Sequence, residues 1–160
     1  MRIFQVIIFA AVFLLSACSG EKPVEKAILG TWVQDTPTSM TANGLQTTTA
    51  DTVLRIQKNG QVHLKRNLDI TGQGLPDDGV KVSLDLRGSW ELSGGQLIQA
   101  QDTALVMPRT SDETARKWAD ELQAQAEQSP PTTKDIIAVD KDQLILQDQN
   151  TGTTDIYRRK

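Results

Sequence analysis

Few residues in this chain have the chemistry that catalysis requires. On paper the single histidine, His63, combines with Asp85 and with Ser83 or Ser89 into a Ser-His-Asp set, in which the serine would be the nucleophile. The chain lacks the Gly-x-Ser-x-Gly elbow that would support such a set, and one histidine cannot make a multi-histidine metal site. The residues that share a strand face with His63 are polar: Lys65, Asn67 and Asp69. We therefore interpret His63 as a solvated strand position, and we predict no enzyme activity, no metal and no cofactor.

The N-terminal segment has the layout of an export signal. Arg2 precedes an apolar run from Val6 to Leu15, which ends at the small residues Ser16 and Ala17. A helix that spans a bilayer needs roughly 20 apolar residues, about twice the length of this run. We therefore expect residues 1–17 to be a signal peptide that is removed.

The sequence Leu15-Ser16-Ala17-Cys18 resembles the bacterial lipobox. In that motif the cysteine thiol is acylated, the peptide bond before it is cut, and the new amino terminus is acylated too. The resemblance implies that acyl chains on Cys18 anchor the mature protein to a membrane, since each buried methylene contributes about 0.8 kcal/mol. In a Gram-negative host, Ser19 rather than Asp after the cysteine implies the outer membrane, facing the periplasm. The alternative is an ordinary cleaved signal with an incidental cysteine.

The composition of the mature chain argues against several kinds of binding site. Removal of residues 1–17 takes away one basic residue and no acidic residue, so the formal charge becomes 16 − 20 = −4. The only basic cluster is residues 158–160, so we predict no nucleic-acid surface. The aromatic residues that remain are few: Trp32, Trp90, Trp118 and Tyr157. Their scarcity argues against a base-stacking platform and against an aromatic sugar site.

We predict that the mature chain consists of a lipidated tether, residues 18–28, followed by one domain, residues 29–160. Its dominant pattern is period-two alternation of apolar and polar residues, which predicts β-strands. One strand face carries a set of aliphatic side chains, Val62, Leu64, Leu68 and Ile70. Only Arg66 interrupts this face, which we place near an open end of the sheet.

The clearest alternation runs over residues 80–92, a long stretch for one flat strand. Gly88 in its middle would permit the bend or bulge that a sheet needs to curl into a barrel. Further strands are predicted at residues 97–98, 136–139, 144–146 and 154–158. Two segments with little apolar periodicity, residues 36–52 and 71–79, are predicted to be long loops.

One segment has helical rather than strand spacing. Thr110-Ser111-Asp112-Glu113 has the pattern of a capping box, and Ser129-Pro130-Pro131 would end the helix. Between them apolar residues recur every three or four positions: Ala115, Trp118, Ala119, Leu122 and Ala126. We predict an amphipathic helix at about 111–128 that lies on the sheet or covers a barrel mouth. The alternative is a helix that gates a cavity or docks on a partner.

Gly30-Thr31-Trp32, just before the first predicted strand, resembles the Gly-x-Trp motif of lipocalins and related small calycin-like barrels. The resemblance implies a mainly β fold: a single antiparallel up-and-down β-barrel or strongly curled sheet, with Trp32 as a plug at the closed end. In those families a basic residue of the last strand packs over this tryptophan. Arg158 or Arg159 can fill that role, and we select Arg158. The helix departs from the lipocalin pattern, because here it is inserted before the final three strands.

Two functions remain open on the sequence. The favoured one is a non-enzymatic envelope lipoprotein, a membrane-tethered binding module for a protein partner in the periplasm, such as an accessory, assembly or inhibitory subunit. The alternative is a lipocalin-like carrier of a small apolar ligand in the barrel interior. The residues that we expect to contact ligand or partner are Leu64, Val82, Leu84, Trp90, Trp118, Leu122 and Leu146.

Overall fold

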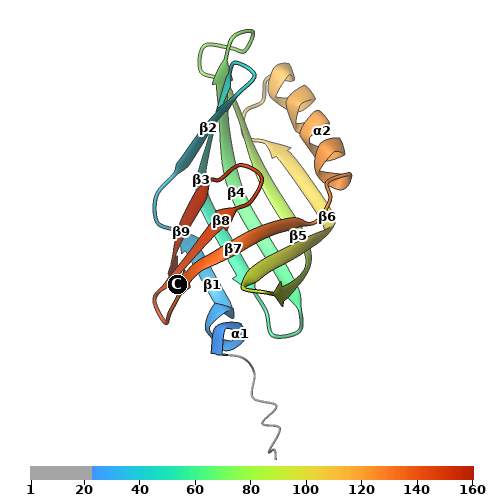
Figure 1. Ribbon diagram of the computed structural model, residues 1–160. Coiled ribbons are helices and arrows are strands. Elements are labelled where there is room, and N and C mark those ends of the chain that lie inside the picture. The colour runs from blue at the N-terminus through green and yellow to red at the C-terminus, as the bar shows by residue number, and fades with distance from the viewer. Residues whose placement is uncertain (1–22) are drawn as a thin grey trace, which may run out of the picture.

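The computed structural model describes residues 23–160, so the predicted signal peptide and Cys18 lie outside the described residues. Those described form nine strands and two helices (Figure 1). In chain order the elements are α1 (Pro23–Ile28), β1 (Gly30–Gln34), β2 (Thr38–Ala42), β3 (Leu45–Ile56), β4 (Gln61–Gly72), β5 (Val80–Ser93), β6 (Gln96–Pro108), α2 (Glu113–Glu127), β7 (Thr132–Val139), β8 (Gln143–Asp148) and β9 (Thr154–Arg159).

The strands close into an antiparallel up-and-down barrel. From β3 to β9 each strand pairs with the next one along the chain, and β1 closes the circle by pairing with both β3 and β9. Eight strands, β1 and β3–β9, thus form the barrel, and β2 extends β3 as an arm at one end (Figure 1). The prediction of a mainly β, lipocalin-like barrel with an inserted helix is confirmed.

A bulge is present at Gly88, as predicted, but its extra residue, Asp102, lies in the partner strand β6. The pairing of β5 with β6 shifts register between Arg87 and Gly88. A Cβ atom at Gly88 would lie 1.9 Å from the carbonyl oxygen of Ala100, so only glycine allows β6 to approach this closely. The bulge bends β6 opposite the middle of β5, which promotes closure of the sheet.

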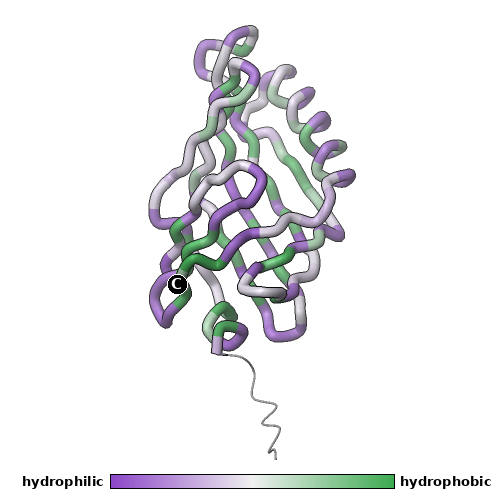
Figure 2. The backbone as a smooth tube through the Cα atoms, in the orientation of Figure 1, coloured by the Kyte–Doolittle hydropathy of each residue, from purple (hydrophilic) through white to green (hydrophobic). Residues whose placement is uncertain are grey.

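Inward-facing aliphatic side chains form two clusters, and Figure 2 shows the alternation of apolar and polar residues along the strands. The first cluster fills the barrel end next to α1 and is centred on Trp32 and Tyr157, both almost fully buried. The second lies between α2 and the strands β4, β5 and β6, and it includes Val82, Ala115 and Ala119. The apolar stripe of α2 therefore packs on the sheet, as the sequence predicted.

The basic residue over Trp32 is Arg159, so the selection of Arg158 was wrong. The guanidinium carbon of Arg159 lies 4.1 Å from the centroid of the Trp32 ring. Arg158 instead pairs with Asp35, with 2.5 Å between its Nε and a carboxylate oxygen. Strand alternation explains the difference: Tyr157 points inward, so Arg159 shares its side and Arg158 faces outward.

Two segments contain more regular structure than predicted. Residues 36–52, expected to be a loop, form most of the β2–β3 hairpin, which turns at Asn43 and Gly44. Apolar alternation is absent there because this arm extends beyond the core, and its threonines supply the β-propensity. Residues 23–28, assigned to the tether, form helix α1, and its last residue, Ile28, is fully buried in the first cluster.

Helix α2 begins later than the predicted residue 111. Asp112, not Thr110, is its N-cap, and the Asp112 carboxylate accepts a hydrogen bond from the Ala115 backbone N–H at 2.7 Å. Within residues 23–160, no helix combines the length and the apolar character needed to cross a bilayer.

Candidate ligand site

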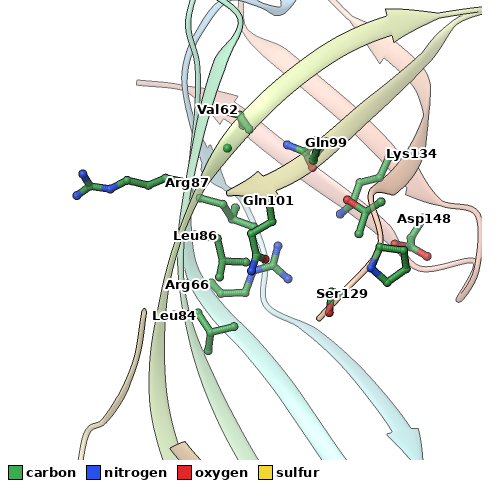
Figure 3. Close-up of a pocket in the computed structure, with 15 residues that line it drawn as sticks. Val62, Arg66, Leu84, Leu86, Arg87, Gln99, Gln101, Ser129, Lys134 and Asp148 are labelled. Carbon is green, nitrogen blue, oxygen red and sulfur yellow. The ribbon is translucent and has the colours of Figure 1, made fainter. Parts of the chain in front are cut away.

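The site that we single out is a cavity where β6 and β7 part. The two strands pair only from Gln96 to Gln99 on β6 and from Thr132 to Asp135 on β7. The rest of β6 continues along β5, while the chain returns to β7 through α2. The inserted helix therefore fills part of the gap, and a cavity of about 190 Å³ remains beside Ser129, just after the helix ends (Figure 3).

Side chains, not another strand, satisfy the free edge of β6. The Gln123 side chain of α2 accepts a hydrogen bond from the Val106 N–H at 2.7 Å and donates one to the Ala104 carbonyl at 2.6 Å. The Gln101 side chain donates to the Ala126 carbonyl of the helix at 2.8 Å. These bonds hold the helix to the strand edge, so the split between β6 and β7 is a built feature of the fold.

The cavity has an apolar wall and a polar wall. The apolar wall comes from β4 and β5 and consists of Val62, Leu64, Leu84 and Leu86. The polar wall carries the uncharged side chains of Gln99, Gln101, Ser129 and Thr132. An apolar lining with a few placed polar groups is typical of small-molecule sites, and the volume is below the roughly 300–1,000 Å³ of sites for drug-sized molecules. The geometry therefore suits a small ligand.

Lys134 and Asp155 form a buried ion pair at the polar side of the cavity. The Nζ of Lys134 lies 2.7 Å from a carboxylate oxygen of Asp155, and both side chains are only about one-tenth exposed. Tyr157 lies next to this pair: burial raises the pKa of its phenol, and the charge of Asp155 raises it further. Tyr157 thus stays protonated, and Lys134 and Asp155 satisfy each other's charge.

Arg66 lies in the same region but has no such partner. Its Nε is buried without a hydrogen-bond partner, and no carboxylate of residues 23–160 forms an ion pair with its guanidinium. Figure 3 shows Arg66 and Lys134 extending from opposite walls toward the same space. A second hollow of about 130 Å³ under the β2–β3 hairpin shares Arg66, Lys134 and Asp148 with the cavity. Arg66 thus lies where the two spaces meet.

The carboxylate of Asp148 also lines the cavity, but it is engaged by the backbone. It accepts hydrogen bonds from the N–H groups of Asn150 and Thr151 at 2.9 and 3.0 Å. Burial raises the pKa of Asp148, but these hydrogen bonds and the charge of Lys134 outweigh the effect and leave the pKa below its ordinary value. Asp148 is therefore ionised at neutral pH and is held by its own turn.

The structure distributes the predicted contact residues over three places. Leu64 and Leu84 line the cavity. Three others pack in the second cluster, between α2 and the sheet: Val82, Trp118 and Leu122. Leu146 is buried in the first cluster, and Trp90 packs against that cluster while its Nε1 donates to the Gln57 carbonyl at 2.8 Å.

Sequence reasoning missed most of the polar wall. Gln99 and Gln101 lie at alternate positions with Leu97 along β6 and therefore face inward as Leu97 does. Polar residues at such inward positions are the sequence signal that could have revealed the polar wall. Lys134 is almost fully buried although it lies in a polar stretch, and its partner Asp155 is 21 residues away. That pairing depends on the register of three strands, which local spacing does not reveal.

The outer face of the barrel carries a separate charge cluster around Asp85. Its carboxylate lies 2.6 Å from His63 Nε2, 3.1 Å from Lys65 Nζ and 3.4 Å from Arg87 Nε. Burial raises the pKa of Asp85, but hydrogen bonds from Lys65 and His63 outweigh it and lower the pKa. Neither Ser83 nor Ser89 is hydrogen-bonded to His63 within the described part of the chain, so no triad is assembled there.

No group of three or more His, Cys, Asp or Glu side chains within residues 23–160 is arranged to hold a metal ion. In comparisons with known proteins, no protein-family model and no curated protein matches this chain.

Proposed function

We propose that this protein is a non-enzymatic lipoprotein of the bacterial envelope that holds a small ligand inside its barrel. The observation that carries the proposal is the cavity at the β6–β7 split, bounded by an aliphatic wall on one side and polar side chains on the other. The sequence alone favoured a protein partner, on the expectation of a solidly packed interior. An open interior with a mixed lining supports the carrier alternative instead.

The proposed anchor agrees with the position of helix α1. Five peptide links separate Cys18 from Pro23, and a fully extended chain of that length reaches at most about 18 Å. A lipid on Cys18 would thus hold the α1 end of the barrel close to the membrane. That end is filled by the first cluster around Trp32, so the cavity would lie on the side of the barrel, away from the lipid surface. With Ser19 after the cysteine, we propose the periplasmic face of the outer membrane.

Native mass spectrometry of the full-length protein, purified from the membrane of its producing cell, tests the proposal. We expect a small-molecule adduct in near-stoichiometric amount. Leu84→Phe, which adds atoms to the aliphatic wall, should remove the adduct. Leu105→Phe is the matched control, because Leu105 neighbours this position in register but is 51% exposed on the outer surface.

An adduct that survives Leu84→Phe would show that the ligand binds elsewhere, and the absence of any adduct from the wild-type protein would contradict the proposal.

A protein partner remains a second candidate, favoured by a groove on the outer face. Arg55, His63 and Arg87 line this groove, whose volume is about 560 Å³, together with the carboxylate of Asp102. Its charge would suit an acidic segment of another envelope protein. A protein that co-purifies with the wild type and is lost from Arg55→Glu, but not from Leu84→Phe, would favour this function over the carrier.

A further inference from the structure

We infer that the cavity binds a short-chain monocarboxylate, whose carboxylate is received by Arg66. This inference rests on the proposed small-ligand function and adds the chemical class of the ligand. It follows from a missing partner: Arg66 is half-buried in the cavity wall, and no carboxylate among residues 23–160 pairs with its guanidinium. Even partial removal of a charge from water is costly when no opposite charge compensates it. The Nε of Arg66 is buried and has no acceptor.

The other charged groups around the cavity already have partners. Lys134 and Asp155 pair at 2.7 Å, and Asp148 is held by the N–H groups of its own turn. Arg87 reaches the cavity wall but extends away from the space in Figure 3 and pairs with Asp85 on the outer face. Arg66 is thus the one cation of the cavity lining in residues 23–160 that no carboxylate contacts, and the anionic group of a ligand would supply that contact.

The shape of the two groups favours a carboxylate. The end of a guanidinium presents two Nη–H groups side by side, and this fork matches the two oxygens of a carboxylate. Lys134 uses one of its three N–H groups on Asp155, and Figure 3 shows its side chain extending toward the same space as Arg66. Both cations therefore have donors directed toward one anionic head.

The rest of the cavity fits a short aliphatic tail. Leu64, Leu84 and Leu86 form the opposite wall, and the volume of about 190 Å³ leaves room for only a small molecule. Contact with these side chains removes apolar surface of the ligand from water, which favours a hydrocarbon chain over a sugar or a nucleotide. The ligand class is therefore a small amphiphile with a carboxylate at one end.

The test compares hexanoate with hexanamide, which has nearly the same shape but no charge. Binding is measured by calorimetry on the full-length protein in lipid nanodiscs, with empty discs as the blank. We expect hexanoate to bind about ten- to a hundredfold more tightly than hexanamide, the range for one charge-assisted hydrogen-bonded pair. Arg66→Gln should abolish this preference, while Arg55→Gln, which removes the same charge from an exposed position outside the cavity lining, should retain it.

A second measurement does not depend on the Arg66 variant being folded. In ¹³C NMR of carboxyl-labelled hexanoate bound to the wild-type protein, the carboxyl pKa should be lower than that of free hexanoate, because a nearby cation favours the ionised form. An unchanged or raised carboxyl pKa would overturn the inference.

The outcomes separate this inference from the proposed function. Equal binding of hexanoate and hexanamide, unaffected by Arg66→Gln, would retain the small-ligand function and reject the carboxylate. If neither probe binds although native mass spectrometry finds a cavity adduct, the short monocarboxylate is again rejected while the function stands. If neither probe binds and no adduct is found, both proposals fail.

Discussion

At the scale of single residues, the barrel contains two arginines in contrasting surroundings. Arg159 donates hydrogen bonds to the carbonyls of Ala27, Leu29 and Lys141 at 2.6–2.7 Å, and its guanidinium covers Trp32. Arg66 has none of these partners among the described residues. The first arginine therefore stabilises the fold by joining α1 to β9, and the second is left with donors for a ligand.

The contacts of Arg159 predict that its substitution costs more stability than substitution of its neighbour Arg158. Arg159→Ala should lower the free energy of unfolding by about 2–4 kcal/mol, because it removes charge-assisted hydrogen bonds and the cation–π contact. Arg158→Ala, which removes an exposed ion pair with Asp35, should cost no more than about 1 kcal/mol. Urea denaturation of the two variants checks the order. A larger loss from Arg158→Ala would mean that the Trp32 contact contributes little.

At the scale of elements, the position of helix α2 determines where the barrel is open. The helix occupies the place beside β6 where a longer β7 would otherwise pair, and Gln123 takes over two of the backbone hydrogen bonds of that edge. The chain thereby leaves a space below the helix without leaving the strand edge unpaired. The cavity is thus a consequence of one inserted helix.

Substitution of Gln123 tests this role of the helix. Gln123→Ala should lower the free energy of unfolding by about 1–3 kcal/mol, because the Val106 N–H and the Ala104 carbonyl lose their partner in a partly buried place. Hydrogen–deuterium exchange of the Val106 amide should accelerate. Gln125→Ala, on the exposed face of the same helix, is the control. Unchanged exchange at Val106 would show that the edge is protected by something other than this side chain.

At the scale of the whole molecule, the acidic composition predicts how stability depends on pH. Hydrogen bonds from Arg158, Thr110 and the Asp142 backbone lower the pKa values of Asp35, Asp112 and Asp140, respectively, below 3.8. A carboxylate with a lowered pKa in the folded state stabilises the protein above its unfolded pKa. That contribution is lost as the pH falls through the folded value.

We therefore expect the free energy of unfolding to fall as the pH drops below the ordinary aspartate pKa of 3.8. Urea titrations at neutral pH, at pH about 4 and at pH about 3, with constant ionic strength, measure the change. Asp112→Asn keeps a good N-cap but cannot titrate, so its stability should fall less on acidification than that of the wild type. A protein that gains stability on acidification would contradict the assignment of these lowered pKa values.

Much of the barrel is encoded locally in the sequence. Alternation of apolar residues predicts β4 and β5, Gly88 predicts the bulge, and three- and four-residue spacing predicts α2. Each of these patterns acts over a few residues, where backbone geometry relates spacing directly to the side that a residue faces. The lipid anchor on Cys18 stays a prediction of the same local kind.

The features of the candidate site, in contrast, arise only in the tertiary structure. The opening between β6 and β7, the pairing of Lys134 with Asp155 and the lack of a partner for Arg66 all depend on how distant strands align. Arg158 and Arg159 illustrate the limit, since a shift of one residue reverses the side that each faces. The sequence by itself determined which residues face inward along most strands. Closure of the barrel decided which of those residues meet, because that depends on register across the whole sheet.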